Sequence, residues 1–395
     1  MVFLELQRNF GIKIPNLLRL DIKKKCNFFV LYSTFRNFAP PKWHKMSTEA
    51  LTKQAIELLS KLISIPRTSR NETEAARFLK GFMEEECKLP TQADGCNLWS
   101  VAPNYDPQKP TLLLNAHIDT VKPVDAWTRD PFTPVIEEGK LYGLGSNDDG
   151  ASLVSLLQVF RVLREQQRPY NLIYLVSAEE EVSGKNGIEH VLPLLPHIDI
   201  ALVGEPTGMQ PAIAEKGLMV LDVTAHGKAG HAARNEGDNA IYHAIKDIQW
   251  FQTYQWEKES PLLGPVKMSV TIINAGTQHN VIPDKCTFTV DVRSNELYSN
   301  EELYQQICQH VEGDVQARSF RLNSSRIELS HPLVQKIISL GGQPFGSPTL
   351  SDQSLMPFPS LKMGPGQSSR SHTADEYIEI REIAEAIAFY LKVLL

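Results

Sequence analysis

The sequence has 395 residues, of which 42% are hydrophobic and 22% charged, and its formal net charge at pH 7 is −6. These values are typical of a globular protein with room for two domains. The negative net charge argues against nucleic acid or an anionic membrane as the main partner, and no apolar run approaches the ~18 residues that a membrane helix needs. The cysteines form no Cys-x-x-Cys pair, so we expect reduced thiols in a cytoplasmic protein rather than disulfides or a zinc ribbon: Cys26, Cys87, Cys96, Cys286 and Cys308.

Residues 1–45 differ in charge from the rest of the chain. They contain nine Lys or Arg and two acidic residues, a net charge of +7, which leaves −13 for the remainder. They lack the apolar core and the small-residue cleavage site of a signal peptide. Two interpretations stay open: a targeting segment, or an extension outside the fold, including upstream sequence translated from too early a start. In the second case Met46-Ser-Thr-Glu, which contains a helix cap, would be the natural beginning.

Apolar periodicity then predicts alternating helices and strands. Helices are expected where apolar residues recur at helical spacing, and strands where short apolar runs end in polar residues. This alternation predicts an α/β fold with a mostly parallel central sheet. The predicted helices cover 48–62, 72–85, 151–163 and 381–394, and the predicted strands cover 111–116, 171–176 and 198–203.

The segment from about 215 to 326 has a different character. Alternating strands are expected over 218–225, 267–273 and 287–293, separated by helices near 239–256 and 300–311. We interpret this segment as an α+β unit inserted into the first domain. The predicted organisation is an extension (1–45), a first catalytic part (46–214), the inserted unit (215–326) and a second catalytic part (327–395).

Potential metal ligands follow the predicted strands. His117 and Asp119 end the first strand and, at positions i and i+2, point to one side, so that one can bind a metal while the other holds its ring nitrogen. The carboxyl ends of strands in an α/β sheet face one crevice. Two His with three carboxylates fit two zinc, cobalt or manganese ions that share a carboxylate. The groups expected to converge with His117 are Asp148 or Asp149, the Glu179–Glu181 run, Glu205 and His372.

Each of these residues also has a simpler interpretation. The Glu179–Glu181 run is also compatible with a solvated charged surface, and Asp148-Asp149-Gly150 with a turn. Glu205 is compatible with a helix cap, and His372 with an ordinary surface residue. Their ordered placement at successive strand ends favours the metal site over these coincidences.

The ordered motifs resemble those of the M20 metallohydrolases, especially the acetylornithine deacetylase and succinyl-diaminopimelate desuccinylase types. The resemblance covers roughly residues 48–395. It implies a zinc-aminopeptidase-like catalytic domain, an inserted dimerisation (lid) domain, and a homodimer formed through that insert. The motifs are His117-x-Asp-Thr-Val, Gly143-x-Gly-x-x-Asp, Ala178-Glu-Glu-Glu, Gly204-Glu-Pro-Thr and Ser371-His-Thr-Ala-Asp-Glu.

The resemblance also implies roles for individual residues. His117 would bind the first metal with Asp119 orienting it, and Asp148 would bridge two metals, with zinc as the first choice and cobalt as the alternative. Glu180 would act as the general base. The further implied residues are the ligands Glu181, Glu205 and His372, the histidine His231 that reaches a partner subunit's active site, and Asn280 and Arg293 near the substrate. Arg293 would clamp a carboxylate, or it is an ordinary salt-bridge partner on an edge strand.

Two loops depart from the family pattern. Leu144 stands between the loop glycines, where the family commonly has Arg, and Asp149-Gly150 follows Asp148, where Lys-Gly is usual. Asp149 therefore competes with Asp148 as the bridging residue, and the spacing favours Asp148. Arg370, in the loop before His372, could recognise a substrate carboxylate, which puts the usual acetylornithine specificity in question.

Together these features predict metal-dependent hydrolysis of the amide bond of an N-acyl amino acid. The first candidate reaction converts N-acetylornithine to ornithine and acetate, a step of arginine biosynthesis. Succinyl-diaminopimelate, acyl-citrulline and dipeptides are the alternative substrates. A non-enzymatic scaffold of this family would have lost ligands, and none is missing from this sequence.

Overall fold

The computed structural model describes residues 47–234 and 236–395. The predicted basic extension lies outside these residues. Over the described ranges, every helix is too short or too polar to traverse a lipid bilayer.

The largest sheet in the described part of the chain has its strands in the order β1-β2-β6-β3-β7-β17-β8-β15, with β16 beside β8. Its four central strands, β6, β3, β7 and β17, run parallel, whereas β1, β2 and β15 pair antiparallel at the flanks. The predicted α/β fold with a mostly parallel sheet is therefore confirmed at its centre, and the flanks make the whole sheet mixed. The bounds are β1 Gln92–Asp94, β2 Asn97–Val101, β3 Thr111–His117, β6 Asn171–Ser177, β7 Ile200–Val203, β8 Ala212–Glu215, β15 Ser325–Arg326, β16 Phe345–Ser347 and β17 Ser360–Lys362.

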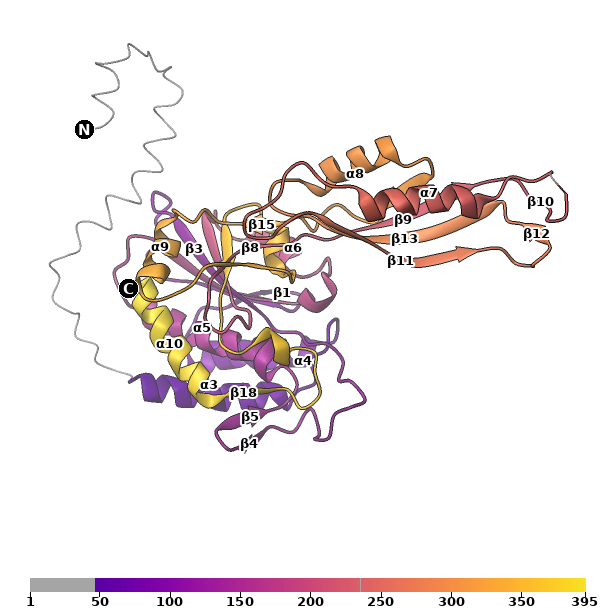
Figure 1. The fold of residues 1–395 in the computed structure, drawn as a ribbon. Coiled ribbons are helices and arrows are strands. Elements are labelled where there is room, and N and C mark those ends of the chain that lie inside the picture. Colours follow the sequence, from indigo (N-terminus) through magenta and orange to yellow (C-terminus); the bar gives the residue numbers. More distant parts are fainter. Residues whose placement is uncertain (1–46, 235) are drawn as a thin grey trace, which may run out of the picture. The chain divides into compact units, whose positions relative to one another are not determined.

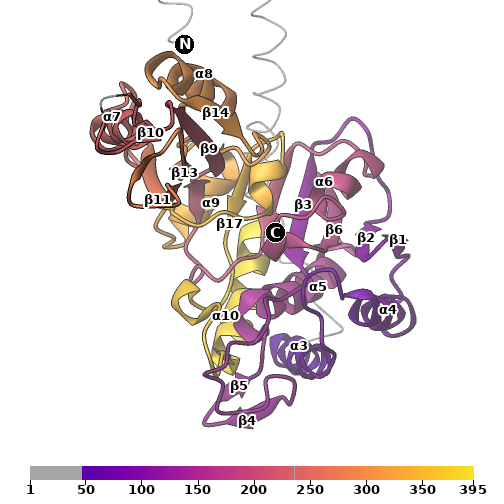
Figure 2. The ribbon, with the colours of Figure 1, turned by 90° about the vertical axis from the view of Figure 1, so that its right-hand side faces the viewer.

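Three long helices lie side by side on one face of this sheet: α3 (Thr48–Ile63), α5 (Ala151–Leu163) and α10 (Ile380–Leu394) (Figures 1 and 2). Ser47 begins α3, because its hydroxyl accepts the N–H of Ala50 at 3.2 Å. The helix predicted over 72–85 keeps α geometry only over α4 (Thr73–Gly81) and continues as one wider turn, η1 (Phe82–Glu86).

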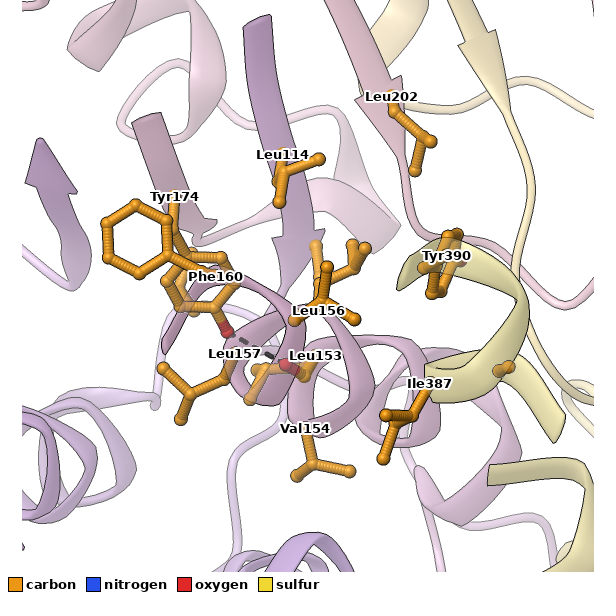
Figure 3. Packing of buried hydrophobic residues seen from close by; sticks show 14 of the residues in the cluster. Leu114, Leu153, Val154, Leu156, Leu157, Phe160, Tyr174, Leu202, Ile387 and Tyr390 are labelled. Carbon is orange, nitrogen blue, oxygen red and sulfur yellow. Dashed lines mark hydrogen bonds between the residues drawn. The ribbon is translucent and has the colours of Figure 1, made fainter. Parts of the chain in front are cut away.

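Figure 3 shows the apolar core between these helices and the sheet. Leu153 of α5 and Tyr390 of α10 belong to this core together with Leu114 of β3 and Tyr174 of β6, and all four residues are buried. The Tyr174 hydroxyl donates to the main-chain oxygen of Leu153 at 2.9 Å, so the phenol is hydrogen-bonded within the core.

The opposite face of the sheet has its own apolar cluster. Leu113 of β3 and Ile173 of β6 pack there with Ile188 of α6 and with Met356. Because both faces of the central strands are covered, β3 and β6 are buried along their whole length. Side chains on these strands can therefore reach solvent or a ligand only at the strand ends. The elements on this face are α6 Ile188–Val191, η4 Leu192–Leu194 and η5 Asp352–Leu355. Helix α9 (Pro332–Ser339) belongs instead to the core on the side of α3, α5 and α10.

A second, antiparallel sheet has the order β11-β13-β9-β14. Helices α7 and α8 cover one of its faces (Figure 1). Its apolar cluster contains only residues between Met219 and Phe320, inside the predicted insert 215–326. The proposed domain boundaries stay a prediction. The bounds are β9 Met219–His226, α7 Ala240–Thr253, β11 Lys267–Ala275, β13 Lys285–Arg293, α8 Asn300–His310 and β14 Asp314–Ala317, with the short pair β10 Gly230–His231 and β12 Val281–Ile282.

A small three-stranded sheet links the end of the chain to the glycine-rich loop. Its order is β18-β5-β4, with Tyr377 opposite Tyr142. This pairing brings the segment after His372 beside the loop that begins at Gly143. The bounds are β4 Val135–Glu137, β5 Lys140–Tyr142 and β18 Tyr377–Glu379, and the loops contain the turns η2 Ser146–Gly150, η3 Glu180–Val182 and η6 Ser368–Arg370.

Candidate metal centre

Three of the predicted site segments leave the same edge of the large sheet. His117 is the last residue of β3 and pairs in parallel register with Ser177, the last residue of β6. The Glu179–Glu181 segment therefore starts next to His117. The neighbouring strand β7 ends at Val203, two residues before Glu205. This is the convergence of strand ends that the sequence predicted.

Asp148 lies between the two candidate histidines. Its Oδ1 is 3.2 Å from Nε2 of His117, and its Oδ2 is 3.7 Å from Nε2 of His372. His372 Nε2 is also 2.8 Å from Oε2 of Glu181. One carboxylate thus faces a different imidazole with each of its oxygens, which is the arrangement of a bridging ligand.

The residues present fit divalent metal ions. One ligand atom each from His117, Asp148 and Glu181 lies within 4.8 Å of the others. Imidazole nitrogens with carboxylate oxygens form a donor set that suits zinc, cobalt or manganese. Glu205 is half-buried and lies two residues after the end of β7, and its role as a further ligand stays a prediction.

Backbone geometry directs several of these side chains. Glu180 and Glu181 lie in a tight turn flanked by Glu179 and Ser183, whose φ angles are +56° and +44°. His372 has a φ of +59°. Positive φ is unfavourable for residues other than glycine and tends to persist at functional sites. Here it turns the Glu181 and His372 side chains toward each other.

Burial raises the pKa of two carboxyl groups of the site, Glu205 and Glu180. Burial raises the pKa of Glu205 to about 8, with Asp148 adding to the rise and Lys362 opposing it. Burial also raises the pKa of Glu180 well above its ordinary value, while His117 opposes the rise. Such carboxylates gain stability when a cation neutralises them. The electrostatics therefore favour a cation at this position.

The pKa values of the two histidines are raised as well, which favours their protonated, charged form. The hydrogen bond to Glu181 raises the pKa of His372 to about 9. Burial would lower the pKa of His117, but hydrogen bonds to Asp119 and Asp148 raise it well above its ordinary value. A metal ion would compete with these protons for Nε2, because the ligand form of imidazole is neutral.

Asp119 lies behind His117, on the side away from Asp148. Nδ1 of His117 is 3.0 Å from the main-chain oxygen of Asp119 and 3.5 Å from its Oδ1. The carboxylate also accepts the N–H groups of Glu180 and Glu181 at 3.0 and 3.2 Å, and the Ser69 hydroxyl at 2.7 Å. Asp119 thus contacts the histidine and fixes the turn that carries the two glutamates.

The structure distinguishes the two candidates for the bridging position. Asp148 faces His117 and His372, as described above. Asp149 is fully buried, and its environment includes Ser152 of α5; burial raises the pKa of its carboxyl well above the ordinary value. Asp148 therefore has the geometry of the bridging residue.

His231 and Asn280 lie together on the β10–β12 pair. His231 is opposite Val281, and the main-chain oxygen of Asn280 accepts the N–H of Ala232 at 3.0 Å. This pair follows the end of β9 that is opposite to its connection with β8 (Figure 1). His231 is exposed, and its Nδ1 accepts the N–H of Ala233. Neither residue is among the contacts of Asp148.

The two candidate arginines are already engaged. Arg293 ends β13, and its Nε donates to Oδ1 of Asp291 at 2.8 Å. Arg370 donates to Oε2 of Glu382 at 2.7 Å and lies 4.6 Å from the ring centre of Tyr377. The ion pair of Arg293 matches the salt-bridge alternative considered for it, and a role of either arginine in substrate binding stays a prediction.

Four buried charged residues near the site were not found from the sequence. Lys362 pairs with Glu215 at 3.2 Å, and both are almost completely buried. Arg67 and Glu376 hold the loop before Asp148 by its backbone. Glu376 is part of the quoted Ser-His-Thr-Ala-Asp-Glu motif, but nothing in that motif indicates its backbone partners.

An α/β sheet with histidines and carboxylates gathered at its strand ends is the architecture of a metal-dependent hydrolase. Residues 113–395 match the family described as Peptidase family M20/M25/M40. The chain belongs to this family, which confirms the predicted resemblance.

Individual relatives cover most of the chain. An acetylornithine deacetylase of Proteus mirabilis (strain HI4320) is 29% identical over 292 residues, which are 68% of this chain and 75% of that protein. A tripeptidase of Staphylococcus aureus has a similar structure with a TM-score of 0.68 at 20% identity, covering 87% of this chain and 97% of its own.

Two further solved structures share the fold at lower identity. A Bacillus subtilis protein described as a dinuclear metal binding peptidase from M20 family has a TM-score of 0.68 at 16% identity, covering 88% of this chain and 98% of its own. A di-peptidase of Saccharomyces cerevisiae has a TM-score of 0.58 at 15% identity, covering 88% and 97%. These structures confirm the fold class.

Proposed function

We propose that this M20 protein is a two-metal amidohydrolase that cleaves N-acyl amino acids, with N-acetylornithine as its substrate. The observation that carries the proposal is the position of Asp148, with one oxygen toward His117 and the other toward His372. The ligands of one ion would be His117 and Glu205, and those of the other Glu181 and His372, with Asp148 shared. This assignment follows the family motifs.

Bound metal ions, zinc first and cobalt as the alternative, would polarise the acyl carbonyl and make water a stronger acid. Glu180 is placed to act as the general base, because its Oε2 is 4.0 Å from Nε2 of His117 and its side chain is only 10% exposed. Glu180 takes a proton from the attacking water, whose oxygen bonds to the carbonyl carbon. Glu180 then passes the proton to the leaving nitrogen as the carbon–nitrogen bond breaks.

Asp119 would support this chemistry without contacting the metals. It holds Nδ1 of His117 and the N–H groups of Glu180 and Glu181. The Asp119 carboxylate therefore fixes both the orientation of the ligand His117 and the position of the base Glu180. Groups behind metal ligands typically change affinity or activity 10- to 100-fold when they are replaced.

The substrate is the least constrained part of the proposal. The Proteus mirabilis relative supports N-acetylornithine. The tripeptidase and the di-peptidase among the similar structures keep short peptides as the second candidate. Succinyl-diaminopimelate and acyl-citrulline are the remaining alternatives. Arg370 is paired with Glu382, and its part in recognising a substrate carboxylate stays a prediction.

A panel of substrates tests the proposed reaction. The zinc-loaded enzyme is assayed with acetyl and succinyl derivatives of ornithine, citrulline and diaminopimelate, and with dipeptides. We expect kcat/KM for N-acetylornithine to exceed the others at least tenfold. Glu180→Gln at the same metal content is the control for contaminating hydrolases. Good cleavage of dipeptides with uniformly poor deacylation would overturn the proposal.

We further propose that the protein is a homodimer formed through the inserted segment. The edge strand β11 exposes Ile272 and Ile273 by 52% and 53%, and α7 exposes Tyr242 by 67%. An exposed apolar edge strand is prone to pair with another chain. In the dimer, His231 of one subunit would donate to the oxyanion at the other subunit's site, a contact typically worth about 3 kcal/mol of transition-state stabilisation.

Mixing two inactive variants tests this contribution. His231→Ala and Glu180→Gln subunits are dissociated, mixed and reassociated. We expect each mixed dimer to regain about half of the wild-type dimer's activity, because one of its two sites combines an intact Glu180 with an intact His231. Failure of verified mixed dimers to regain activity would remove His231 from the reaction.

We also propose a cytoplasmic location, which is supported by the free thiols of Cys87, Cys96, Cys286 and Cys308.

A further inference from the structure

The loop that carries Asp148 is held by two buried charges that come from distant parts of the chain. Glu376 Oε2 accepts the N–H of Gly145 at 2.9 Å, and its Oε1 accepts the N–H groups of Asn147 and Asp148 at 2.8 and 2.9 Å. From the other side, Nη2 of Arg67 donates to the main-chain oxygen of Gly145 at 3.0 Å. Gly145 is therefore bound through both of its backbone groups.

Arg67 connects this loop with the strand end that carries His117. Its Nη1 donates to the main-chain oxygen of Ile118, the residue between His117 and Asp119. The main-chain oxygen of Arg67 accepts the N–H of Thr120 at 3.0 Å. A planar guanidinium can bind two carbonyls in fixed geometry, which a lysine cannot do. Arg67 thus fixes the separation between the His117 and Asp148 segments.

Glu376 makes the second connection. It follows His372 by four residues and precedes β18, which pairs with β5 directly before the glycine-rich loop. Three backbone N–H groups converge on its carboxylate. Glu376 thus fixes the Asp148 loop relative to the segment of His372.

Close packing leaves little freedom in this arrangement. Arg67 and Glu376 are each 2% exposed. A Cβ atom added at Gly145, whose φ is +71°, would lie 2.6 Å from Nη2 of Arg67. Leu144, the neighbouring residue, is buried and apolar, so the cation that binds this loop comes from outside it. Buried charges are costly unless they are hydrogen-bonded. The Glu376 carboxylate and the two Nη groups of Arg67 all bond to backbone, whereas Nε of Arg67 is buried without a hydrogen-bond partner among the described residues.

From these contacts we propose that Arg67 and Glu376 are positioning residues that set the metal affinity of the site. They hold the segments of His117, Asp148 and His372 at the spacing that metal ions require. The inference rests on the proposed function only in that the site binds metal. Arg67 lies outside residues 113–395, which carry the family match.

The test compares metal binding with thermal stability in full-length protein. Metal-free wild type, Arg67→Met and Glu376→Gln are titrated with Co²⁺, and the visible absorption of the bound ion and its dissociation constant are recorded. Arg164→Met is the matched control, because Arg164 also donates to a main-chain oxygen, that of Lys88 at 3.0 Å, away from the site.

We expect Arg67→Met and Glu376→Gln to weaken Co²⁺ binding 10- to 100-fold and to alter the absorption spectrum. Arg164→Met should leave both within twofold even where it lowers Tm. Arg67→Lys should be intermediate, and it decides the question if Arg67→Met does not fold. Unchanged affinity in the site variants with only a lower Tm would overturn the proposal. Absence of Co²⁺ binding in the wild type would instead count against the proposed function itself.

Discussion

The two main sheets of the molecule bury their residues in different ways. In the large sheet, β3 and β6 are buried along their whole length because helices and loops cover both faces. In the smaller sheet, β9 alternates between buried and half-buried residues, and the edge strand β11 is largely exposed. The first sheet presents functional groups only at its strand ends, whereas the second presents an edge.

This difference separates the expected roles of the two regions. Polar residues that end a fully buried strand sit at the boundary between a rigid core and an accessible crevice, which suits precise metal ligation. An open sheet with exposed isoleucines at its edge suits association with another chain. Variants in the first region should therefore change metal binding and chemistry, and variants in the second should change assembly.

The largest effect is expected from removing a ligand at a strand end. His117→Ala deletes an imidazole that faces Asp148 at 3.2 Å, so we expect loss of at least one metal ion per chain and a fall in kcat/KM of at least about 1,000-fold. Elemental analysis and steady-state kinetics measure the two quantities. Retention of both ions with normal turnover would contradict the ligand assignment.

A smaller effect is expected from replacing Asp119, which holds the metal ligand His117 in place. Asp119→Asn keeps the size of the side chain but weakens its hold on Nδ1 of His117 and on the turn of Glu180 and Glu181. We expect kcat/KM to fall about 100-fold while metal content at saturating zinc stays within twofold. The opposite pattern, in which metal is lost and the remaining loaded enzyme has normal activity, would mean that Asp119 acts as a ligand.

The next prediction concerns the exposed edge strand β11 of the second sheet. Ile273→Lys places a charge on β11, so we expect the sedimentation coefficient to shift from dimer to monomer. Activity should fall about 100-fold, because each site then lacks His231 of the partner subunit. Leu329→Lys is the matched control, since Leu329 is equally exposed at 53% but lies outside the insert. Equal behaviour of the two variants would argue against β11 as the interface.

The smallest predicted effect is a pH dependence of stability. It comes from His331, which lies outside both the metal site and the edge strand β11. His331 begins α9, where its Nδ1 accepts the N–H of Leu333 at 3.2 Å. Burial lowers the pKa of His331 from 6.5 to about 4, so the neutral ring stabilises the fold above pH 6.5 and this stabilisation is lost as the pH falls toward 4.

Asn in place of His331 keeps an acceptor for the helix but does not titrate. Between pH 7 and pH 5 the wild type should therefore lose about 1 kcal/mol more stability than His331→Asn, measured by urea unfolding of the metal-free proteins. Parallel pH profiles for the two proteins would show that His331 has no such influence.

Local sequence patterns predicted much of the fold and the order of the site segments. Helix α5 begins and ends at the predicted residues, and β3 extends one residue further, to His117 itself. Apolar periodicity and strand-end polarity are local signals, so they can be recognised without knowing the tertiary structure. The same logic indicated that His117, Asp148 and His372 would meet.

What the sequence could not predict depends on long-range contacts. Arg67 and Glu376 act on backbone groups far away in the chain, and a buried arginine has no periodic signature. Arg370 was expected to recognise substrate because of its loop, but its pairing with Glu382 depends on how α10 packs. Which carbonyl or carboxylate an arginine meets is fixed only when the segments come together.

The central claim is that Glu180 moves the proton at a two-metal site. The most direct measurement determines metal content and kcat for Glu180→Gln and wild type under identical zinc loading. We predict two zinc ions per chain in both proteins and a kcat about 1,000-fold lower in the variant. Near-normal turnover by a fully loaded Glu180→Gln enzyme would contradict it.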